Sequence, residues 1–156
     1  MSQLSVDEQL KGVYVLIVRL RGDADINIGA LGSQHFPKGL YWYVGSAQTA
    51  LEKRISRHLR REKRKFWHID YLLDNRAAEV EKILFKEAAK TEECTIADEM
   101  GQVNRAIVGF GCSDCSCKSH LFYIEQRDFI PKGMTEIETN KLNTLAVFGT
   151  PLTSGY

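Results

Sequence analysis

The sequence predicts an α/β fold of the α+β kind, in which a small central, mainly antiparallel sheet of three strands is flanked by helices. Two runs rich in β-branched and aromatic side chains, residues 12–20 and 40–44, predict strands. An apolar stripe with helical spacing predicts a helix over residues 49–63. The 156 residues suffice to bury one core and are too few for two comfortable domains.

The composition is that of an ordinary globular protein, with 44% hydrophobic and 26% charged residues. No apolar run approaches the roughly 18 residues of a membrane span, so we expect no membrane association. Residues 1–10 lack a basic region followed by an apolar one, and we therefore expect a cytoplasmic location. No repeat or linker divides the chain. We expect one domain over residues 1–156, with its core at about 11–124 and a helical extension at about 125–156.

The first strand, residues 12–20, is apolar at nearly every position, which predicts burial on both faces near the centre of the sheet. Residues 22–39 hold four of the 12 glycines and predict a loop with a short strand at 26–28. We expect the strand at 40–44 to end in a turn at Gly45-Ser46. An antiparallel hairpin with the first strand is the simplest pairing.

The helix expected over residues 49–63 carries its apolar stripe at Leu51, Ile55 and Leu59. At 100° per residue, His58 lies about 20° and Arg54 about 60° to one side of Leu51. Both side chains therefore border the buried face, from which they can reach a cleft at the sheet.

The rest of the chain predicts a helix at 67–73, a strand at 80–86, a helix at 91–100, a strand at 121–124 and a last helix at 135–147. Thr91 is the candidate N-cap of the third helix, and Gly101 is expected just past its end. On the short helix, His68 and Asp70 point about 200° apart and cannot both serve one site. We expect Asp70 to fix a loop or to pair with an arginine, while His68 stays a candidate substrate contact.

The net charge is only +1, but eight of the 21 basic residues lie between positions 53 and 65, with Glu62 as the single acid there. This local excess of positive charge suits a nucleic-acid interface. A solvated helix face explains it equally well. The candidate nucleic-acid contacts are Lys53, Arg57, Arg61 and Arg64.

Three of the four cysteines lie within six residues, which favours reduced thiols or a metal site over a secreted disulfide framework. The candidate zinc ligands are Cys112, Cys115, Cys117 and His120. Their spacing argues against zinc, because four ligands within nine residues leave hardly any loop to wrap around an ion. We favour a structural turn, with a role for Ser113, Asp114 or His120 near an active cleft as the alternative. Cys94 is most simply a small buried residue.

Several of these residues form an ordered set. Gly12-Val13-Tyr14 is followed by Tyr43-Val44-Gly45, and then by Arg54, His58 and Glu93. This set resembles the catalytic residues of the GIY-YIG nuclease superfamily. The strings Trp-His-Ile-Asp-Tyr-Leu-Leu and Ser-Asp-Cys-x-Cys-x-Ser-His-Leu-Phe-Tyr are similar to an uncharacterised, largely archaeal branch of it, and the resemblance covers about residues 11–124.

The resemblance implies a metal-dependent endonuclease that hydrolyses phosphodiester bonds in DNA, in repair or recombination. Glu93 would hold one Mg²⁺ or Mn²⁺ ion, because hard cations prefer oxygen ligands. Tyr14 and Tyr43 would orient or deprotonate the attacking water, if the site lowers a phenol pKa that is normally about 10. Arg54 would clamp the phosphate and His58 would shuttle protons or hold the water.

Each assignment has a structural alternative. The two tyrosines suit a core, Arg54 a basic surface, His58 the boundary of a core, and Glu93 a solvated helix face that also carries Glu92. The two half-motifs, Gly12-Val13-Tyr14 and Tyr43-Val44-Gly45, are separated by 28 residues, further than is common in the superfamily. Many members also have an asparagine near the end of the domain, for which Asn104 is a weak candidate here. The rival functions are a non-catalytic nucleic-acid-binding module and a protein-interaction or zinc module built on the cysteines.

Overall fold

A computed structural model describes residues 11–60, 62–112, 117–124, 131 and 133–137. The elements along the chain are β1 (Gly12–Leu20), β2 (Ala24–Asn27), the 3₁₀ turn η1 (Gly29–Leu31), β3 (Ser33–Phe36), β4 (Gly39–Ala47), α1 (Leu51–Leu59), α2 (His68–Leu73), β5 (Ala78–Lys86), α3 (Thr91–Val103), β6 (Arg105–Ala106), β7 (Leu121–Tyr123) and β8 (Thr135–Ile137). Six strands form the main sheet in the order β6-β7-β4-β1-β5-β8, and each neighbouring pair is antiparallel.

The prediction of a three-stranded sheet is therefore wrong, although the mainly antiparallel α/β class is confirmed. The sequence analysis missed the two outermost strands, β6 and β8, which contain two and three residues. Unlike β7, which is also short but wholly apolar, these two segments contain the charged residues Arg105 and Glu136 and form no apolar run. β8 occupies part of the predicted last helix, whose remainder lies outside the described residues.

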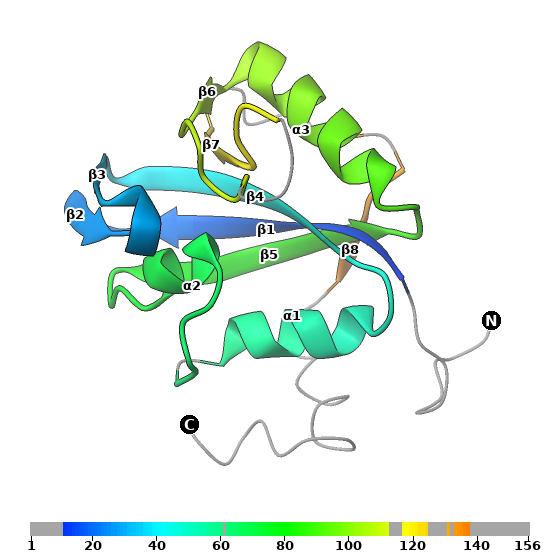
Figure 1. The fold of residues 1–156 in the computed structure, drawn as a ribbon, viewed down its shortest axis with the longest axis horizontal. Helices are drawn as coiled ribbons and strands as arrows, with labels where there is room; N and C mark the ends of the chain where they lie inside the picture. Colours follow the sequence, from blue (N-terminus) through cyan, green and yellow to red (C-terminus); the bar gives the residue numbers. More distant parts are fainter. Residues whose placement is uncertain (1–10, 61, 113–116, 125–130, 132, 138–156) are drawn as a thin grey trace.

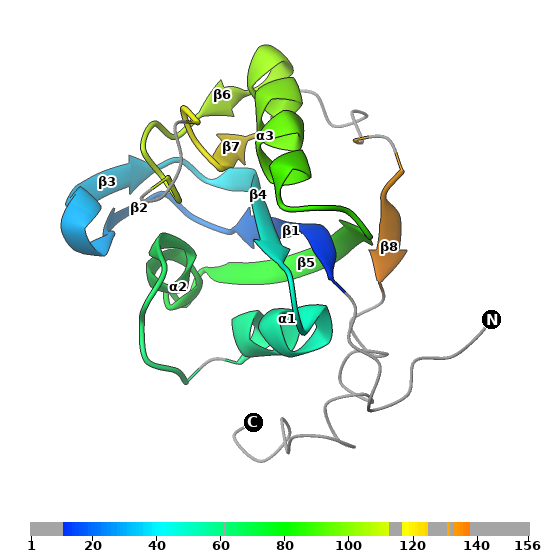
Figure 2. The same cartoon turned by 45° about the vertical axis from the view of Figure 1, so that its right-hand side comes forward.

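The sheet carries α1 and α2 on one face and α3 on the other (Figures 1 and 2). β1 supplies both cores by alternation. Tyr14, Leu16 and Val18 pack toward α1 and α2, whereas Val13, Val15 and Ile17 pack toward α3. This confirms the prediction that residues 12–20 form a strand buried on both faces near the centre of the sheet.

The predicted hairpin partner also pairs with β1, with Val15 opposite Val44. The predicted turn at Gly45-Ser46 is wrong, because β4 continues to Ala47 with both residues in the ladder. Gly45 is a glycine for another reason. A Cβ atom there would lie 2.6 Å from the ring of Tyr14, so the glycine makes room for the tyrosine of the neighbouring strand.

The helices differ from expectation mainly at their ends. α1 stops at Leu59, and α3 runs on to Val103 with Gly101 inside it. The proposed Thr91 cap is also wrong, because the N-cap position is Lys90 and no side chain caps it. The α2 helix and the β5 strand lie where the sequence predicts them. The loop predicted at 22–39 contains a separate hairpin of β2 and β3.

Candidate active site

A cleft of about 760 Å³ opens where β1 and β4 meet α1, α2 and the first turn of α3. Four of the five predicted catalytic side chains line it: Tyr14, Tyr43, Arg54 and Glu93. The fifth, His58, is buried beside the cleft against Tyr14. The structure thus brings together residues that are spread over 80 positions of the sequence.

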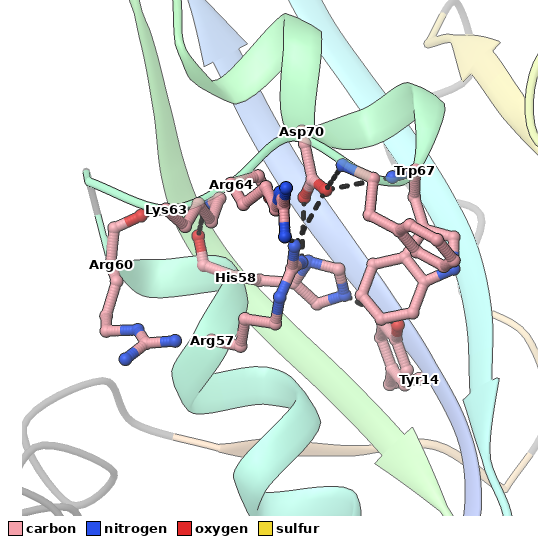
Figure 3. Close-up of polar contacts among 9 residues, drawn as sticks. Tyr14, Arg57, His58, Arg60, Lys63, Arg64, Trp67 and Asp70 are labelled. Atoms are coloured by element: carbon pink, nitrogen blue, oxygen red, sulfur yellow. Dashed lines mark hydrogen bonds and ion pairs between the residues drawn. The ribbon is translucent and has the colours of Figure 1, made fainter.

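Tyr14 and His58 form a buried pair, with the Tyr14 hydroxyl 2.7 Å from Nε2 of His58. Burial, with a smaller effect from the neighbouring Lys63, lowers the pKa of His58 to about 3, so the imidazole is neutral at physiological pH. Burial also raises the pKa of the Tyr14 phenol well above its usual value of about 10, against the opposing effect of Arg54. Both groups are therefore neutral, and one hydrogen lies between the Tyr14 oxygen and Nε2 of His58. Figure 3 shows the two side chains facing each other between α1 and β1.

Tyr43 lies on the same face of the sheet, two residues along β4 from the partner of Tyr14. Its ring packs edge-on against His58 at 6.2 Å between centroids, and the Tyr14 ring lies 5.4 Å from the same imidazole. Burial raises the pKa of Tyr43, and the neighbouring Tyr14 adds to the effect. Both phenols are therefore protonated near neutral pH.

Arg54 is held at the cleft by two contacts. Its Nη1 donates to the carbonyl of Ser46 over 2.9 Å, and its guanidinium lies 4.4 Å from the ring centroid of Trp67. A stacked guanidinium loses little conformational freedom when it binds an anion, because its orientation is already fixed. This arrangement suits recognition of a phosphate.

Glu93 reaches the cleft from the opposite face of the sheet. Its Oε1 accepts a hydrogen bond from the Ser46 hydroxyl at 3.0 Å, and its Oε2 lies 2.9 Å from Nδ1 of His120. The adjacent Glu92 instead pairs with Lys86. The structure thereby distinguishes two neighbouring carboxylates that the sequence analysis could not separate. Glu93 and the Ser46 hydroxyl offer oxygen donors of the kind that a hard cation takes.

Asp70 fixes the wall of the cleft although it does not line it. The carboxylate is fully buried and receives two hydrogen bonds of 3.0 Å from Arg57, together with the backbone N–H groups of Phe66 and Trp67 (Figure 3). Burial alone would raise the pKa of Asp70, but these four donors outweigh it and lower the pKa. The predicted pairing of Asp70 with an arginine is confirmed. The contact of the Trp67 ring with both Arg54 and Arg57 was not predicted from the sequence.

The sequence also matches the model of a protein family. The family model described as "Domain of unknown function DUF123" matches residues 13–142. The chain belongs to the DUF123 family. No curated protein and no solved structure matches it. The DUF123 match begins within β1 and covers all five residues gathered at the cleft.

The predicted nucleic-acid contacts of this DUF123 chain occupy different surroundings. Lys53 and Arg64 are exposed, whereas Arg57 is held by Asp70 and stacks on Trp67 at 4.5 Å. Arg61 lies outside the described residues. None of the described helices is long and apolar enough to cross a membrane.

Two weaker candidates take different places in the DUF123 structure. His68 lines the cleft, and its Nδ1 accepts the backbone N–H of Gly111 at 2.8 Å. Burial lowers the pKa of His68, which favours its neutral form. Asn104 follows the last residue of α3, at the opposite end of that helix from Glu93, and is buried there.

Proposed function

We propose that this DUF123 chain is a metal-dependent endonuclease that hydrolyses phosphodiester bonds in DNA. The observation that carries the proposal is the convergence of Tyr14, Tyr43, Arg54, His58 and Glu93 on one cleft, which the sequence resemblance to GIY-YIG nucleases predicts. The cleft combines a proton acceptor, a cation and a carboxylate, which are the groups that phosphodiester hydrolysis requires.

The proton acceptor in this proposal is the Tyr14–His58 pair. Water attacks phosphorus and passes its proton to the Tyr14 oxygen, while the phenol proton moves along the 2.7 Å contact to Nε2 of His58. The bond from phosphorus to the leaving oxygen breaks, that oxygen takes a proton from solvent, and His58 then returns its proton to solvent. Tyr14 therefore never needs to exist as a free phenolate, which its raised pKa would disfavour. Because burial lowers the pKa of His58 to about 3, the imidazolium is costly in the free protein, and the negative charge of the bound phosphate would lower that cost.

The phosphate would bind to Arg54, whose guanidinium is fixed by Ser46 and Trp67. Glu93 and the Ser46 hydroxyl would hold one Mg²⁺ or Mn²⁺ ion, since both present oxygen donors at the cleft. Such an ion, when bound, supplies a Lewis acid that stabilises negative charge on the phosphoryl oxygens. The exposed Lys53 and Arg64 are available for contacts to the DNA backbone.

The test is a cleavage assay with Mg²⁺ or Mn²⁺ on duplex, single-stranded, flap and four-way-junction DNA. Wild type should cleave at least one substrate, and Arg54→Ala and Glu93→Ala should each lose at least about 100-fold in rate. Glu92→Ala is the matched control, because it removes the neighbouring carboxylate that pairs with Lys86, and it should retain activity. An absence of cleavage by wild type, with salt-sensitive DNA binding intact in every variant, would replace this proposal with a non-catalytic binding module.

A further inference from the structure

A second cluster of chemically reactive side chains lies behind the cleft. The Sγ atoms of Cys94 and Cys117 and one ring nitrogen of His120 all lie within 4.8 Å of one another. Cys94 comes from the first half of α3, whereas Cys117 and His120 precede β7. The folded chain therefore assembles ligands from two separated segments, which removes the objection that spacing raises against the ligand set considered from sequence.

We propose that Cys94, Cys117 and His120 bind one Zn²⁺ ion. Two thiolates and an imidazole form a donor set that favours zinc over Mg²⁺ or Ca²⁺. Ligand atoms around a tetrahedral zinc are about 3.5 to 3.8 Å apart, given bonds of roughly 2.0 to 2.3 Å. Movements of about 1 Å therefore suffice to close this cluster on an ion. Three protein ligands leave a fourth position for water or another donor.

The surroundings of His120 support the assignment. Its side chain is 3% exposed, and its Nδ1 lies 2.9 Å from Oε2 of Glu93 and 3.1 Å from the carbonyl oxygen of Val44. With Nδ1 engaged in this way, the nitrogen that binds the metal is Nε2. A histidine that binds zinc through one nitrogen commonly donates its other N–H to a carboxylate or carbonyl, which fixes the ring and raises its basicity.

The carboxylate of Glu93 links the proposed zinc site to the cleft. Glu93 contacts His120 through Oε2 and the Ser46 hydroxyl through Oε1. The backbone of His120 is also bonded to β4, through the N–H of Val44 at 2.9 Å. Zinc at this place would join α3 to the segment before β7 and position Glu93. This role does not depend on the proposed endonuclease activity.

The first experiment measures zinc in the full chain after loading with Zn²⁺ and exhaustive dialysis. Wild type should retain about one zinc per chain, and Cys94→Ser and Cys117→Ser should each lower zinc affinity at least tenfold. Cys112→Ser is the matched control, because the Cys112 thiol lies outside the cluster and contacts the Phe110 carbonyl. Retention of no zinc by wild type, or an equal loss in Cys112→Ser, would overturn the proposal.

A second measurement keeps the test decisive if a cysteine variant fails to fold. Wild type titrated with Co²⁺ should develop thiolate-to-cobalt charge-transfer absorption together with the visible bands of tetrahedral cobalt, and Zn²⁺ should abolish both. Glu93→Gln should keep these bands while weakening metal affinity by about 10- to 100-fold, as expected for a carboxylate that supports a ligand. Absence of thiolate bands in wild type overturns the zinc site. Neither readout involves DNA or cleavage, so failure here is distinguishable from failure of the proposed function.

Discussion

The two faces of the sheet bury different kinds of side chain, although β1 contributes alternate side chains to both. The face under α1 and α2 buries three phenols, an imidazole and a carboxylate: Tyr14, Tyr41, Tyr43, His58 and Asp70. The α3 face packs apolar side chains such as Val15, Ile96 and Met100. Its titratable groups, Glu93 and His120, lie beside the last residues of β4.

This difference shows how the cleft is built. One face supplies an internal polar network, and the other supplies a carboxylate that reaches the same opening at Ser46. Gly45 lines this opening, and its missing side chain makes room for the Tyr14 ring. We call the face under α1 and α2 the network face. Its contribution to the free energy of unfolding should depend on satisfied polar contacts, whereas that of the α3 face should depend on the apolar volume that it buries.

The largest effect is expected from Asp70→Ala on the network face. The substitution leaves the half-buried Arg57 charge and the N–H groups of Phe66 and Trp67 without their acceptor. We expect the free energy of unfolding, measured with urea, to fall by about 3 to 5 kcal/mol. Asp74→Ala is the control, because Asp74 makes an exposed 3.5 Å pair with Lys65, and it should change stability by less than about 1 kcal/mol. Equal losses in the two variants would remove the distinction between the network and an ordinary surface.

The α3 face should respond to volume instead. Met100→Ala removes a fully buried side chain of the α3-face core and should cost about 3 kcal/mol in urea unfolding. Because no buried charge is left behind, Met100→Leu should recover most of that loss. Failure of leucine to restore stability would mean that the α3 face is not governed by packing.

A smaller loss of stability is expected at Gly45, which ends the second motif and pairs with Tyr14 of the first. Gly45→Ala places a Cβ 2.6 Å from the Tyr14 ring, which β-sheet pairing holds in place, and should destabilise the protein by about 1 to 3 kcal/mol. Gly22→Ala is the matched control, because a Cβ at Gly22 meets nothing within 4 Å. Urea unfolding of the two variants measures the difference. If both substitutions were neutral, the packing of Tyr14 on Gly45 would not shape the cleft.

The sequence predicted the network face better than the edges of the sheet. The long strands and α2 follow from dense apolar patterns, and the ordered set from Tyr14 to Glu93 follows from motif resemblance. Sequence could not show that Arg57 is held by Asp70, because a basic run looks the same whether its side chains are solvated or paired. It could not assemble Cys94 with Cys117 either, since that contact depends on how α3 crosses the sheet. The two-residue strand β6 forms because it pairs with β7, and such pairing cannot be read from its own sequence.

The smallest predicted effect is a pH dependence of stability that distinguishes the network face, where His58 lies, from the α3 face. His58 has a pKa of about 3 in the folded chain and about 6.5 when unfolded. Between these values the unfolded chain binds a proton that the folded chain does not, so stability is complete above pH 6.5 and falls as the pH is lowered. The slope contributed by this one group is at most about 1.4 kcal/mol per pH unit. Asp70, whose pKa is lowered from 3.8, adds its own loss only below that pH.

Urea unfolding at intervals from pH 7.5 to 4.5 therefore reports on His58 together with His68, whose pKa burial also lowers, and this window lies above the ordinary pKa of Asp70. His58→Gln removes the group with the larger shift while offering Tyr14 a polar partner, so its stability should lose the share of the slope that His58 contributes and keep that of His68. His35→Gln is the control, since His35 is an exposed partner of Asp25 on the separate hairpin, and the slope should survive there. A slope that is the same in His58→Gln as in wild type would show that the acid sensitivity comes from elsewhere and that the Tyr14–His58 pair is not held neutral by burial.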